Sequence, residues 1–370
     1  MSGMRIDRLE LEGFRNYLRQ AAQFDPRCNV ICGENAQGKT NLLEAVVYLS
    51  RGRSPRARTD REMIGFQAEG ARLTAQVESR ERAFKIQADL WRGKRRKITV
   101  NQVPVKTGAA LGDVYHTVLF QPEDLSLIRE GAAARRRFMD TALCQLRPRY
   151  AAVLAGYERA REQKGRILRD WGRRPDLLEA LPEFDEQMIR LGAALIRYRY
   201  RFSLRLGEHA AVHHRECSGG REELELCYRT VSSVEDAGAD AETLADRLRQ
   251  HMESHRQAEL ASGLCLSGPH KDDLLVTIGG RDAKQYASQG QTRTAALALK
   301  LAEREIYRDA SGEWPVLLLD DVLSELDLRR QDFVLNRIAG GQVFITCCEE
   351  DRLSGLLGGR VFHVENGTIR

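Results

Sequence analysis

The sequence lacks a long hydrophobic run, a signal peptide and paired cysteines. No apolar stretch approaches the roughly 20 residues that span a bilayer, and the start MSGMRIDRLE has no apolar centre of the kind that signal peptides carry. The eight cysteines include no Cys-x-x-Cys spacing, so we interpret them as reduced thiols of a folded core. We therefore expect a cytoplasmic protein that is not attached to a membrane.

The composition is also not that of a disordered chain, and the net charge is small. Hydrophobic residues make up 42% of the chain, which is enough for a packed core, and the net charge is only +5. The basic residues nevertheless cluster in Arg51–Arg61, Arg92–Lys97, Arg135–Arg137 and Arg197–Arg205. Such clusters suit a polyanionic partner, although any one of them could equally be a solvated surface.

The hydrophobic pattern divides the chain into three parts. A length of 370 residues favours two structural units. Residues 5–105 are rich in strand patterns, the middle from about 135 to 261 has helical periodicity, and strand patterns return at 274–278, 316–319 and 343–346. We predict an α/β lobe formed by residues 1–130 and 262–370, with a helical lobe of residues 131–261 inserted. The pair Asn366-Gly367 predicts a closing hairpin.

A phosphate-binding loop is the strongest local signal. The pattern G-x-x-x-x-G-K-T follows an apolar run and precedes a helix-like segment, as a P-loop requires. Its backbone N–H groups would surround the phosphates, Lys39 would reach the β and γ oxygens, and Thr40 would offer its hydroxyl to Mg²⁺. The nucleotide-binding residues of this segment are Gly33, Glu34, Asn35, Ala36, Gln37, Gly38, Lys39, Thr40 and Asn41.

Two adjacent carboxylates end the apolar run Val316–Leu319. This is the form of a Walker B motif, in which Asp320 would hold Mg²⁺ and Asp321 would polarise the attacking water. The catalytic residues of the prediction are therefore Lys39, Asp320 and Asp321. The next residues, Ser324 to Asp327, resemble the D-loop of ABC ATPases.

A third segment distinguishes an ABC-type switch from other P-loop proteins. The residues Ser288, Gln289, Gly290 and Gln291 open the helix predicted over 292–307 and resemble the ABC signature motif. A serine hydroxyl at a helix N-terminus forms an anion site, which in ABC dimers binds the γ-phosphate held by the other subunit. A serine helix cap is the structural alternative.

These motifs disfavour several other functions. A GTPase would need an NKxD sequence, which is absent, and a kinase has no use for a signature segment. The insert lacks the sustained heptads of a long SMC coiled coil. A transporter ATPase subunit, or another ABC-type switch that does not act on DNA, remains the alternative, against which the helical insert and its arginine clusters argue.

Several blocks, in the same order along the chain, are similar to the RecF family. They are LELEGFRNY at 9–17, GENAQGKTNLLEA at 33–45, FQPEDL at 120–125, RRRFMD at 135–140, GPHKDDL at 268–274, the signature SQGQ, and LLLDDVLSELD at 317–327. The resemblance implies an ABC-type P-loop ATPase head with a mixed sheet, helices and an inserted helical lobe. It also places Arg15, Asn16 and Gln121 at the nucleotide, with Gln121 at the Q-loop Mg²⁺ position, and Asp327 at a dimer seam. Glu123 or Asp124 could fill the role of Gln121.

The resemblance implies a function in recombinational DNA repair and replication-fork maintenance. The family pattern is an ATP-gated homodimer on duplex DNA and ssDNA–dsDNA junctions, with RecR and RecO as partners that help to load RecA. The enzyme activity implied is a weak DNA-dependent ATPase with ATP and Mg²⁺. Asp321 in place of the usual glutamate, and Thr346 where a switch histidine is common, predict slow turnover. Lys271 stands where the family pattern has arginine, which predicts a looser phosphate contact.

The stretch Arg197–Arg205 leaves two interpretations open. Arg197, Arg201 and Arg205 share one helical face, and Tyr198 and Phe202 lie on a neighbouring one. This pattern fits a DNA-contacting surface and fits equally well a helix with an aromatic core stripe and a solvated arginine edge.

Overall fold

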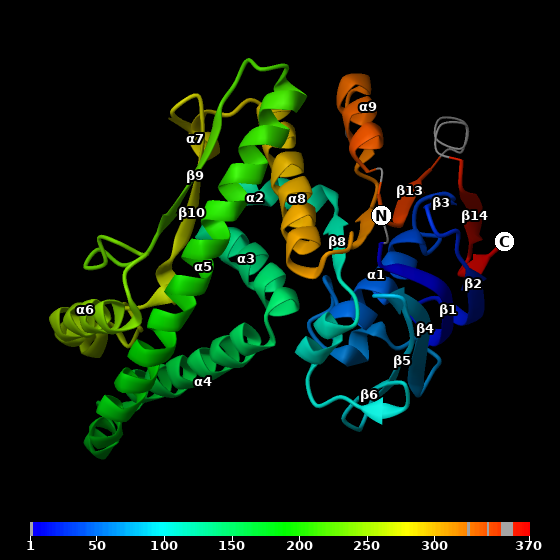
Figure 1. Ribbon diagram of the computed structural model, residues 1–370. Coiled ribbons are helices and arrows are strands. Elements are labelled where there is room, and N and C mark those ends of the chain that lie inside the picture. Colours follow the sequence, from blue (N-terminus) through cyan, green and yellow to red (C-terminus); the bar gives the residue numbers. More distant parts are fainter. Residues whose placement is uncertain (1–2, 324–325, 339, 349–357) are drawn as a thin grey trace. The chain divides into compact units, whose positions relative to one another are not determined.

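The computed structural model describes residues 3–323, 326–338, 340–348 and 358–370. The chain divides into two compact units (Figure 1). The first unit comprises Met1–Leu125, Glu216–Gly219 and Arg293–Arg370, and the second comprises Ser126–Arg215 and Gly220–Thr292. The first unit is therefore discontinuous in sequence.

An antiparallel sheet and a mainly parallel sheet form the first unit. The antiparallel sheet has the strand order β2-β1-β4-β5-β6-β7 and the second sheet has the order β15-β14-β3-β13-β12-β8. In the second sheet only β15 runs antiparallel to its neighbour among the described strands. The strands are β1 (Arg5–Phe14), β2 (Tyr17–Gln23), β3 (Cys28–Cys32), β4 (Gly70–Ser79), β5 (Arg82–Trp91), β6 (Lys97–Val100), β7 (Val103–Pro104), β8 (Thr117–Phe120), β12 (Val316–Leu319), β13 (Val343–Cys347), β14 (Arg360–Glu365) and β15 (Thr368–Ile369).

Helix α1 (Lys39–Arg51) joins the two sheets into one core. Leu42 and Leu43, and every residue from Glu44 to Ser50, are buried, and the apolar ones pack with β1, β4, β5, β12, β13 and β14. In β1 the buried Leu9 and Leu11 alternate with more exposed residues, as expected of a strand covered on one face. The β3 run CNVIC is buried throughout, as expected of a parallel strand covered on both faces. The other helices of this unit are η1 (Asp60–Met63), η2 (Gly108–Asp113), η3 (Pro122–Leu125), α9 (Leu328–Arg337) and most of α8 (Gln289–Ser311).

The second unit is mainly helical and carries a small antiparallel sheet in the order β11-β10-β9. The apolar spacing predicted for the middle of the chain is confirmed in the long helix α5, where Leu195, Phe202 and Leu206 are buried. The elements are α2 (Ser126–Arg129), α3 (Ala132–Leu146), α4 (Pro148–Asp170), η4 (Pro175–Ala180), α5 (Leu181–Ser218), β9 (Leu224–Arg229), α6 (Ala241–Ser262), η5 (Pro269–Lys271), β10 (Asp273–Ile278), β11 (Arg281–Asp282) and α7 (Ala283–Tyr286).

The second unit extends beyond the helical insert predicted from the sequence. The sequence analysis placed the insert at residues 131–261, whereas the second unit begins at Ser126 and continues to Thr292. The reason is a long-range strand pair: β10 pairs antiparallel with β9, from Asp273 opposite Arg229 to Ile278 opposite Leu224. The strand pattern at 274–278 was assigned to the α/β lobe, whereas it lies in the second unit.

Buried charges hold together the blocks that were singled out in this unit. Arg199, only 3% exposed in its side chain, pairs with Asp140 at 2.9 Å and with Asp272 at 2.9 Å. Arg135 pairs with Asp273 at 2.7 Å. The RRRFMD and GPHKDDL segments are thus joined by ion pairs inside the unit, where a lost partner would leave an uncompensated buried charge.

Of the two interpretations of Arg197–Arg205, the structure supports a core role for Phe202 and does not test DNA contact by the arginines. Phe202 packs edge-to-face against Phe138, which supports a core role for its aromatic edge, while Arg201 is exposed. DNA contact by Arg197, Arg201 and Arg205 stays a prediction.

The chain ends on the hairpin that its Asn-Gly pair predicted. Asn366 and Gly367 have φ values of 49° and 73°, and the turn joins β14 to β15. Positive φ at both central residues is the requirement of a type I′ turn.

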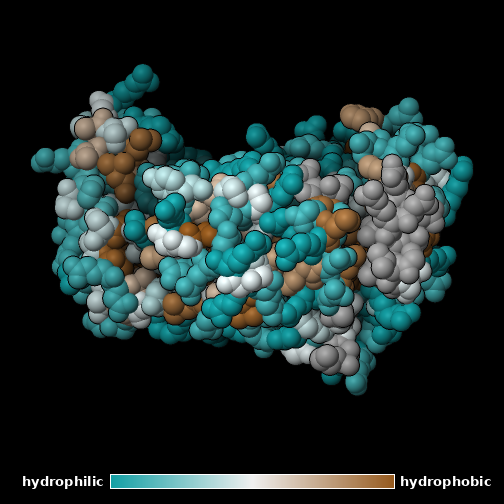
Figure 2. All heavy atoms as spheres, turned by 90° about the horizontal axis from the view of Figure 1, so that it is seen from above, coloured by the Kyte–Doolittle hydropathy of each residue, from teal (hydrophilic) through white to brown (hydrophobic). Residues whose placement is uncertain are grey.

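In the described ranges, no helix is long and apolar enough to cross a membrane. The face in Figure 2 carries mainly hydrophilic residues, with hydrophobic ones in small groups between them.

Candidate nucleotide site

The loop between β3 and α1 has the backbone that a P-loop needs. Gly33 and Gly38 have φ values of 152° and 122°, where side chains are strained. A Cβ on Gly33 would lie 2.4 Å from the carbonyl oxygen of Val364, and one on Gly38 would lie 2.7 Å from the amide of Asn16. The hydroxyl of Tyr17 donates to the Gly38 carbonyl at 2.9 Å. Only glycine fits these two positions.

The loop is also held by residues far away in the sequence. The backbone carbonyl of Gln37 accepts hydrogen bonds from the side chain of Asn16 at 2.8 Å and from the N–H of Gly367 at 3.0 Å. The side-chain carbonyl of Gln37 accepts from the N–H of Asn366 at 2.6 Å. Asn41 donates to the Asn16 side chain at 2.9 Å. The terminal hairpin and Asn16 therefore fix the outer side of the loop.

Lys39 lies folded back over the loop. Its Nζ donates to the carbonyl oxygens of Gly33 at 2.6 Å and Glu34 at 3.1 Å, and the residue is only 4% exposed. A buried ammonium is costly unless its donors are used, and backbone carbonyls use them here. A bound phosphate would offer the same ammonium a charged acceptor.

Asp320 is the centre of a hydroxyl cluster under the loop. Its Oδ1 accepts from Thr40 at 3.1 Å and from Thr346 at 2.8 Å, and the Thr346 hydroxyl accepts from the N–H of Asp321 at 2.8 Å. Burial raises the pKa of Asp320, the two hydroxyl donors lower it, and the neighbouring Asp321 raises it again. Such a carboxylate gains most from a cation that compensates its burial.

Gln121 reaches the same edge of the sheet. It follows β8, which pairs parallel with β12 so that Phe120 lies opposite Leu319, and the N–H of Asp320 donates to the Phe120 carbonyl at 2.9 Å. Carboxyl ends of adjacent parallel strands meet at one edge, where open sheets bind ligands. Asp124, by contrast, is committed to the turn, because it accepts from the N–H of Gln121 at 2.9 Å.

Arg15 makes contacts other than the phosphate contact that the resemblance implied. Its guanidinium forms two hydrogen bonds to Glu44, at 2.7 and 2.8 Å, and a third to the carbonyl of Glu62 at 2.6 Å. The Glu44 side chain is fully buried. In this structure Arg15 compensates a buried carboxylate of α1.

The signature residues begin helix α8 as a reciprocal cap. The Ser288 hydroxyl accepts from the N–H of Gln291 at 3.2 Å, and the Gln291 side chain accepts from the N–H of Ser288 at 2.7 Å. Gln291 also donates to Glu222 at 2.8 Å. Ser288 to Gln291, with Gln289 and Gly290 between them, belong to the second unit, whereas the P-loop belongs to the first.

The D-loop prediction is only partly described. Ser324 and Glu325 lie outside the described residues. Asp327 caps α9 by accepting from the N–H of Arg330 at 3.0 Å, and it also forms an ion pair with the Arg330 guanidinium. That guanidinium donates to Thr294 at 2.8 Å, which fixes the start of α9 against α8.

The oxygen donors present fit Mg²⁺. The Thr40 hydroxyl and the Asp320 carboxylate are hard ligands in hydrogen-bonding contact, and Mg²⁺ is usually held by one or two such groups together with phosphates and water. Among the residues that the structure describes, no group of three or more His, Cys, Asp or Glu side chains could hold a metal ion alone. Thr40 and Asp320 would therefore hold the ion jointly with a nucleotide.

The sequence analysis missed the contacts between residues that lie far apart along the chain. Thr346 was noted only as a substitute for a histidine, and its two bonds to the Asp320–Asp321 pair were not expected. The clamp of Gln37 by the terminal hairpin was also missed. The Asn-Gly turn was a visible signal, but nothing local indicated which loop it would contact.

The fold and the site define an ATPase head of the ABC and SMC class. The parallel sheet, the loop before α1, the carboxylate pair after β12 and the capped start of α8 are the parts of that class, and the predicted fold class is confirmed. A structure of the Smc head domain from Pyrococcus furiosus, 16% identical, covers 99% of this chain and 95% of its own with a TM-score of 0.56, and shows the same fold.

Within that class, the chain belongs to the RecF family of DNA replication and repair proteins. The family model of the RecF/RecN/SMC N terminal domain matches residues 5–369. DNA replication and repair protein RecF of Lachnoclostridium phytofermentans is 38% identical over 99% of both chains, and that of Bacillus subtilis is 36% identical over 99% of this chain and 100% of its own. A solved structure of the recombination mediator protein RecF-ATPrS in the RecFOR pathway is 32% identical, covers 100% of this chain and 98% of its own, and has a TM-score of 0.92. The resemblance noted in the sequence is confirmed.

Proposed function

We propose that this chain binds ATP with Mg²⁺ in the loop Gly33–Thr40 and hydrolyses it slowly, as a switch for a DNA-bound homodimer. The observation that carries the proposal is the cluster in which Thr40 and Thr346 both donate to Asp320, directly below the loop. Because both hydroxyls donate to Oδ1, they leave Oδ2 of Asp320 for a cation beside a P-loop hydroxyl. A solved RecF-ATP structure, 32% identical with a TM-score of 0.92, supports the choice of nucleotide.

The catalytic roles follow from chemistry. Lys39 exchanges its carbonyl partners for phosphate oxygens, and Asp320 and Thr40 hold Mg²⁺, which neutralises charge on the phosphates when it is bound. Asp321 polarises the attacking water. Gln121, at the end of the neighbouring strand β8, is the third residue proposed to lie at the Mg²⁺ ion. Residues Gly33 to Asn41, with Asn16, surround the phosphates.

Dimerisation supplies the remaining part of the site. Ser288 and the N-terminus of α8 form a preorganised anion site, because the reciprocal cap of Ser288 and Gln291 fixes the first turn of the helix. In the proposal this surface binds the γ-phosphate held by a second copy of the chain, and Asp327 lies at the seam. Arg15 leaves Glu44 only if the nucleotide offers a stronger acceptor.

We propose that the ATP-driven switch acts on duplex DNA and ssDNA–dsDNA junctions in cytoplasmic recombinational repair. Support comes from the relatives, which are named DNA replication and repair proteins, and from the RecFOR pathway of the 32% identical structure. RecR and RecO are the proposed partners, through which RecA is loaded. A transporter subunit would not need to bind DNA with a steep dependence on salt, so a salt titration separates the two functions.

A mixing experiment tests the composite site. Ser288→Arg should leave ATP affinity of the monomer nearly unchanged and abolish ATP-dependent dimerisation, because the new cation blocks the phosphate surface. Lys39→Met should lose nucleotide binding. A mixture of the two variants has one intact composite site per heterodimer, so partial return of ATPase activity is expected. Equal loss of monomer ATP affinity in both variants would show that Ser288 acts within its own chain, and the dimer proposal would fail.

A further inference from the structure

The turn between β4 and β5 has an unusual backbone. Arg80 and Glu81 have φ values of 50° and 56°, both in the left-handed region. Type I′ turns of this kind normally use Asn or Gly, since other residues are strained there. A turn built from arginine and glutamate must therefore be held by its surroundings.

Glu313 holds this turn. Its carboxylate accepts from the Ser79 hydroxyl at 2.9 Å and from the N–H of Arg80 at 3.0 Å on both oxygens. Glu313 is 6% exposed and Ser79 is 2% exposed. Buried charge-assisted bonds of this kind are strong, so the tip of the hairpin is rigid and the directions of its side chains are preset.

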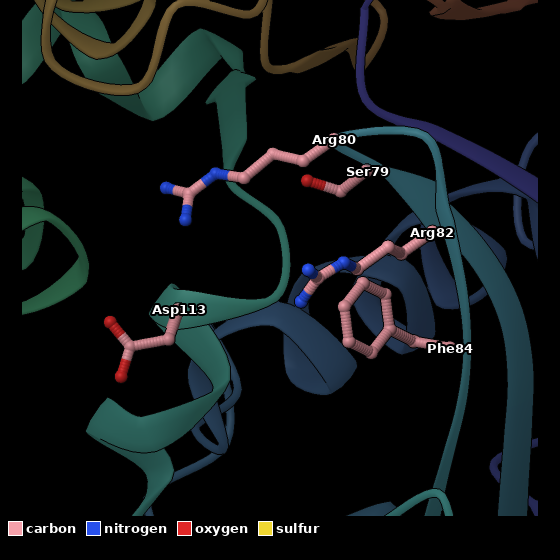
Figure 3. Close-up of a pocket in the computed structure, with 5 residues that line it drawn as sticks. All are labelled: Ser79, Arg80, Arg82, Phe84 and Asp113. Carbon is pink, nitrogen blue, oxygen red and sulfur yellow. The ribbon is translucent and has the colours of Figure 1, made fainter.

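A pocket with a volume of 440 Å³ opens beside the rigid tip, lined by Ser79, Arg80, Arg82, Phe84 and Asp113. In Figure 3 the guanidinium groups of Arg80 and Arg82 extend from the hairpin toward the side where Asp113 of η2 lies, with the Phe84 ring beside Arg82. The two arginines and Asp113 are exposed, and none of the three forms an ion pair with another described side chain. Opposite charges thus face one pocket without neutralising each other.

We propose that this pocket binds an extended segment of a partner protein that carries acidic, apolar and basic side chains in that order. Guanidinium forks bind carboxylates in bidentate fashion, the half-buried Phe84 ring offers an apolar surface, and Asp113 accepts a cation. The volume is that of a site for a few side chains. None of the lining residues belongs to the P-loop.

The charge arrangement favours a protein segment over DNA. A phosphate backbone that reached Arg80 and Arg82 would bring its charges toward Asp113, which no phosphate can satisfy. A peptide satisfies both signs at once. A small anion would use the arginines and leave Asp113 unpaired.

The test uses the full chain and fluorescein-labelled peptides followed by fluorescence anisotropy. The peptide Asp-Glu-Leu-Lys should bind saturably, and Arg82→Glu should weaken it by about tenfold or more, because attraction becomes repulsion. Arg95→Glu makes the same charge change at an exposed site outside the pocket and should leave affinity unchanged. Both changes are on the surface, so thermal unfolding should be similar to that of the unchanged chain.

A charge swap makes the test specific. Asp113→Lys should weaken Asp-Glu-Leu-Lys and strengthen Asp-Glu-Leu-Glu, since the last side chain then meets the opposite charge. The proposal is overturned if neither peptide binds saturably, or if Arg82→Glu and Arg95→Glu have equal effects. It is also overturned if Asp113→Lys raises the affinity for duplex DNA and that duplex displaces the peptide, which would make the pocket a DNA site.

Discussion

The hydroxyl of Thr346 donates a hydrogen bond of 2.8 Å to Asp320 and accepts one of the same length from the N–H of Asp321. One side chain at the end of β13 therefore positions both carboxylate residues at the end of β12. Thr346 is 1% exposed, so water cannot replace it. The position that a histidine often occupies in ABC ATPases here joins the two residues that are proposed to hold Mg²⁺ and to polarise the attacking water.

The first prediction concerns this hydroxyl. Thr346→Val keeps the shape but removes both bonds, which leaves a buried acceptor and donor with fewer partners and costs about 1–3 kcal/mol of stability. Mg²⁺-dependent ATP hydrolysis should fall by about tenfold or more, as Asp320 loses its orientation. Thr346→Ser retains the hydroxyl and should recover the rate. Equal rates for the Val and Ser variants would contradict the positioning role.

The second prediction separates binding from hydrolysis. Asp321 has a φ of 52°, which Asn also tolerates, so Asp321→Asn should fold normally. Removing the charge beside the attacking water should slow turnover by about a hundredfold or more while ATP still binds. Light scattering should show an ATP-dependent dimer that persists longer. An unchanged hydrolysis rate would exclude Asp321 from the catalytic role.

The third prediction tests the clamp on the P-loop. A Cβ on Gly367 would lie 2.1 Å from the carbonyl oxygen of Asn16, so Gly367→Ala should push the terminal hairpin off Gln37. ATP affinity, measured by calorimetry, should fall by about tenfold because the loop loses its outer support.

Gly280→Ala is the matched control for this clamp. Gly280 has the same φ of 73°, and nothing lies within 4 Å of its added Cβ. It therefore introduces the same backbone strain without the displacement, and ATP affinity should be unchanged. A similar loss of affinity in both variants would mean that strain alone, rather than the clamp, explains the effect.

The fourth prediction is a pH dependence of stability from His270. Its Nε2–H donates to the Cys265 carbonyl at 2.9 Å, so its Nδ1 is the unprotonated nitrogen, which accepts from the Tyr157 hydroxyl at 2.7 Å. Burial is the main reason that the pKa of His270 falls from 6.5 to about 4. Between these values the unfolded chain binds a proton that the folded chain excludes.

Stability should therefore fall as the pH drops from 6.5 toward 4, by at most about 3 kcal/mol from this residue, and should be fully present above 6.5. His270→Gln offers the same donor and acceptor without titrating, and its denaturation midpoint should vary less with pH across that window. The exposed His363→Gln is the control and should retain the full dependence. Identical pH profiles for His270→Gln and the unchanged chain would contradict the assignment.

Much of the site could be predicted from the sequence, because its parts are short motifs. The P-loop, the carboxylates after β12 and the capped start of α8 each lie within a few consecutive residues, where backbone conformation and side-chain chemistry are set together. Asn366-Gly367 predicted its turn for the same reason, since positive φ at two successive positions selects those residue types.

Other features depend on pairs of segments that meet only in the folded chain. The insert was expected to end at residue 261, but β10 found its partner in β9, and two strands with similar patterns cannot be assigned to sheets by periodicity alone. The contact of Arg15 with the buried carboxylate of Glu44 was likewise not foreseen, and the predicted place of Arg15 at the phosphates stays a prediction. Burial of a charge is decided by packing and is not visible in the sequence.

The sequence by itself determined the class of site and the order of its parts, because these are written in short contiguous motifs. Only the tertiary structure decided how these parts are supported, by Thr346 beneath Asp320 and by the terminal hairpin on Gln37, and only the tertiary structure placed Glu313 behind the β4–β5 turn. Each of these contacts joins residues that are far apart along the chain, so each forms only when the sheets and helices have already brought their backbones within hydrogen-bonding distance.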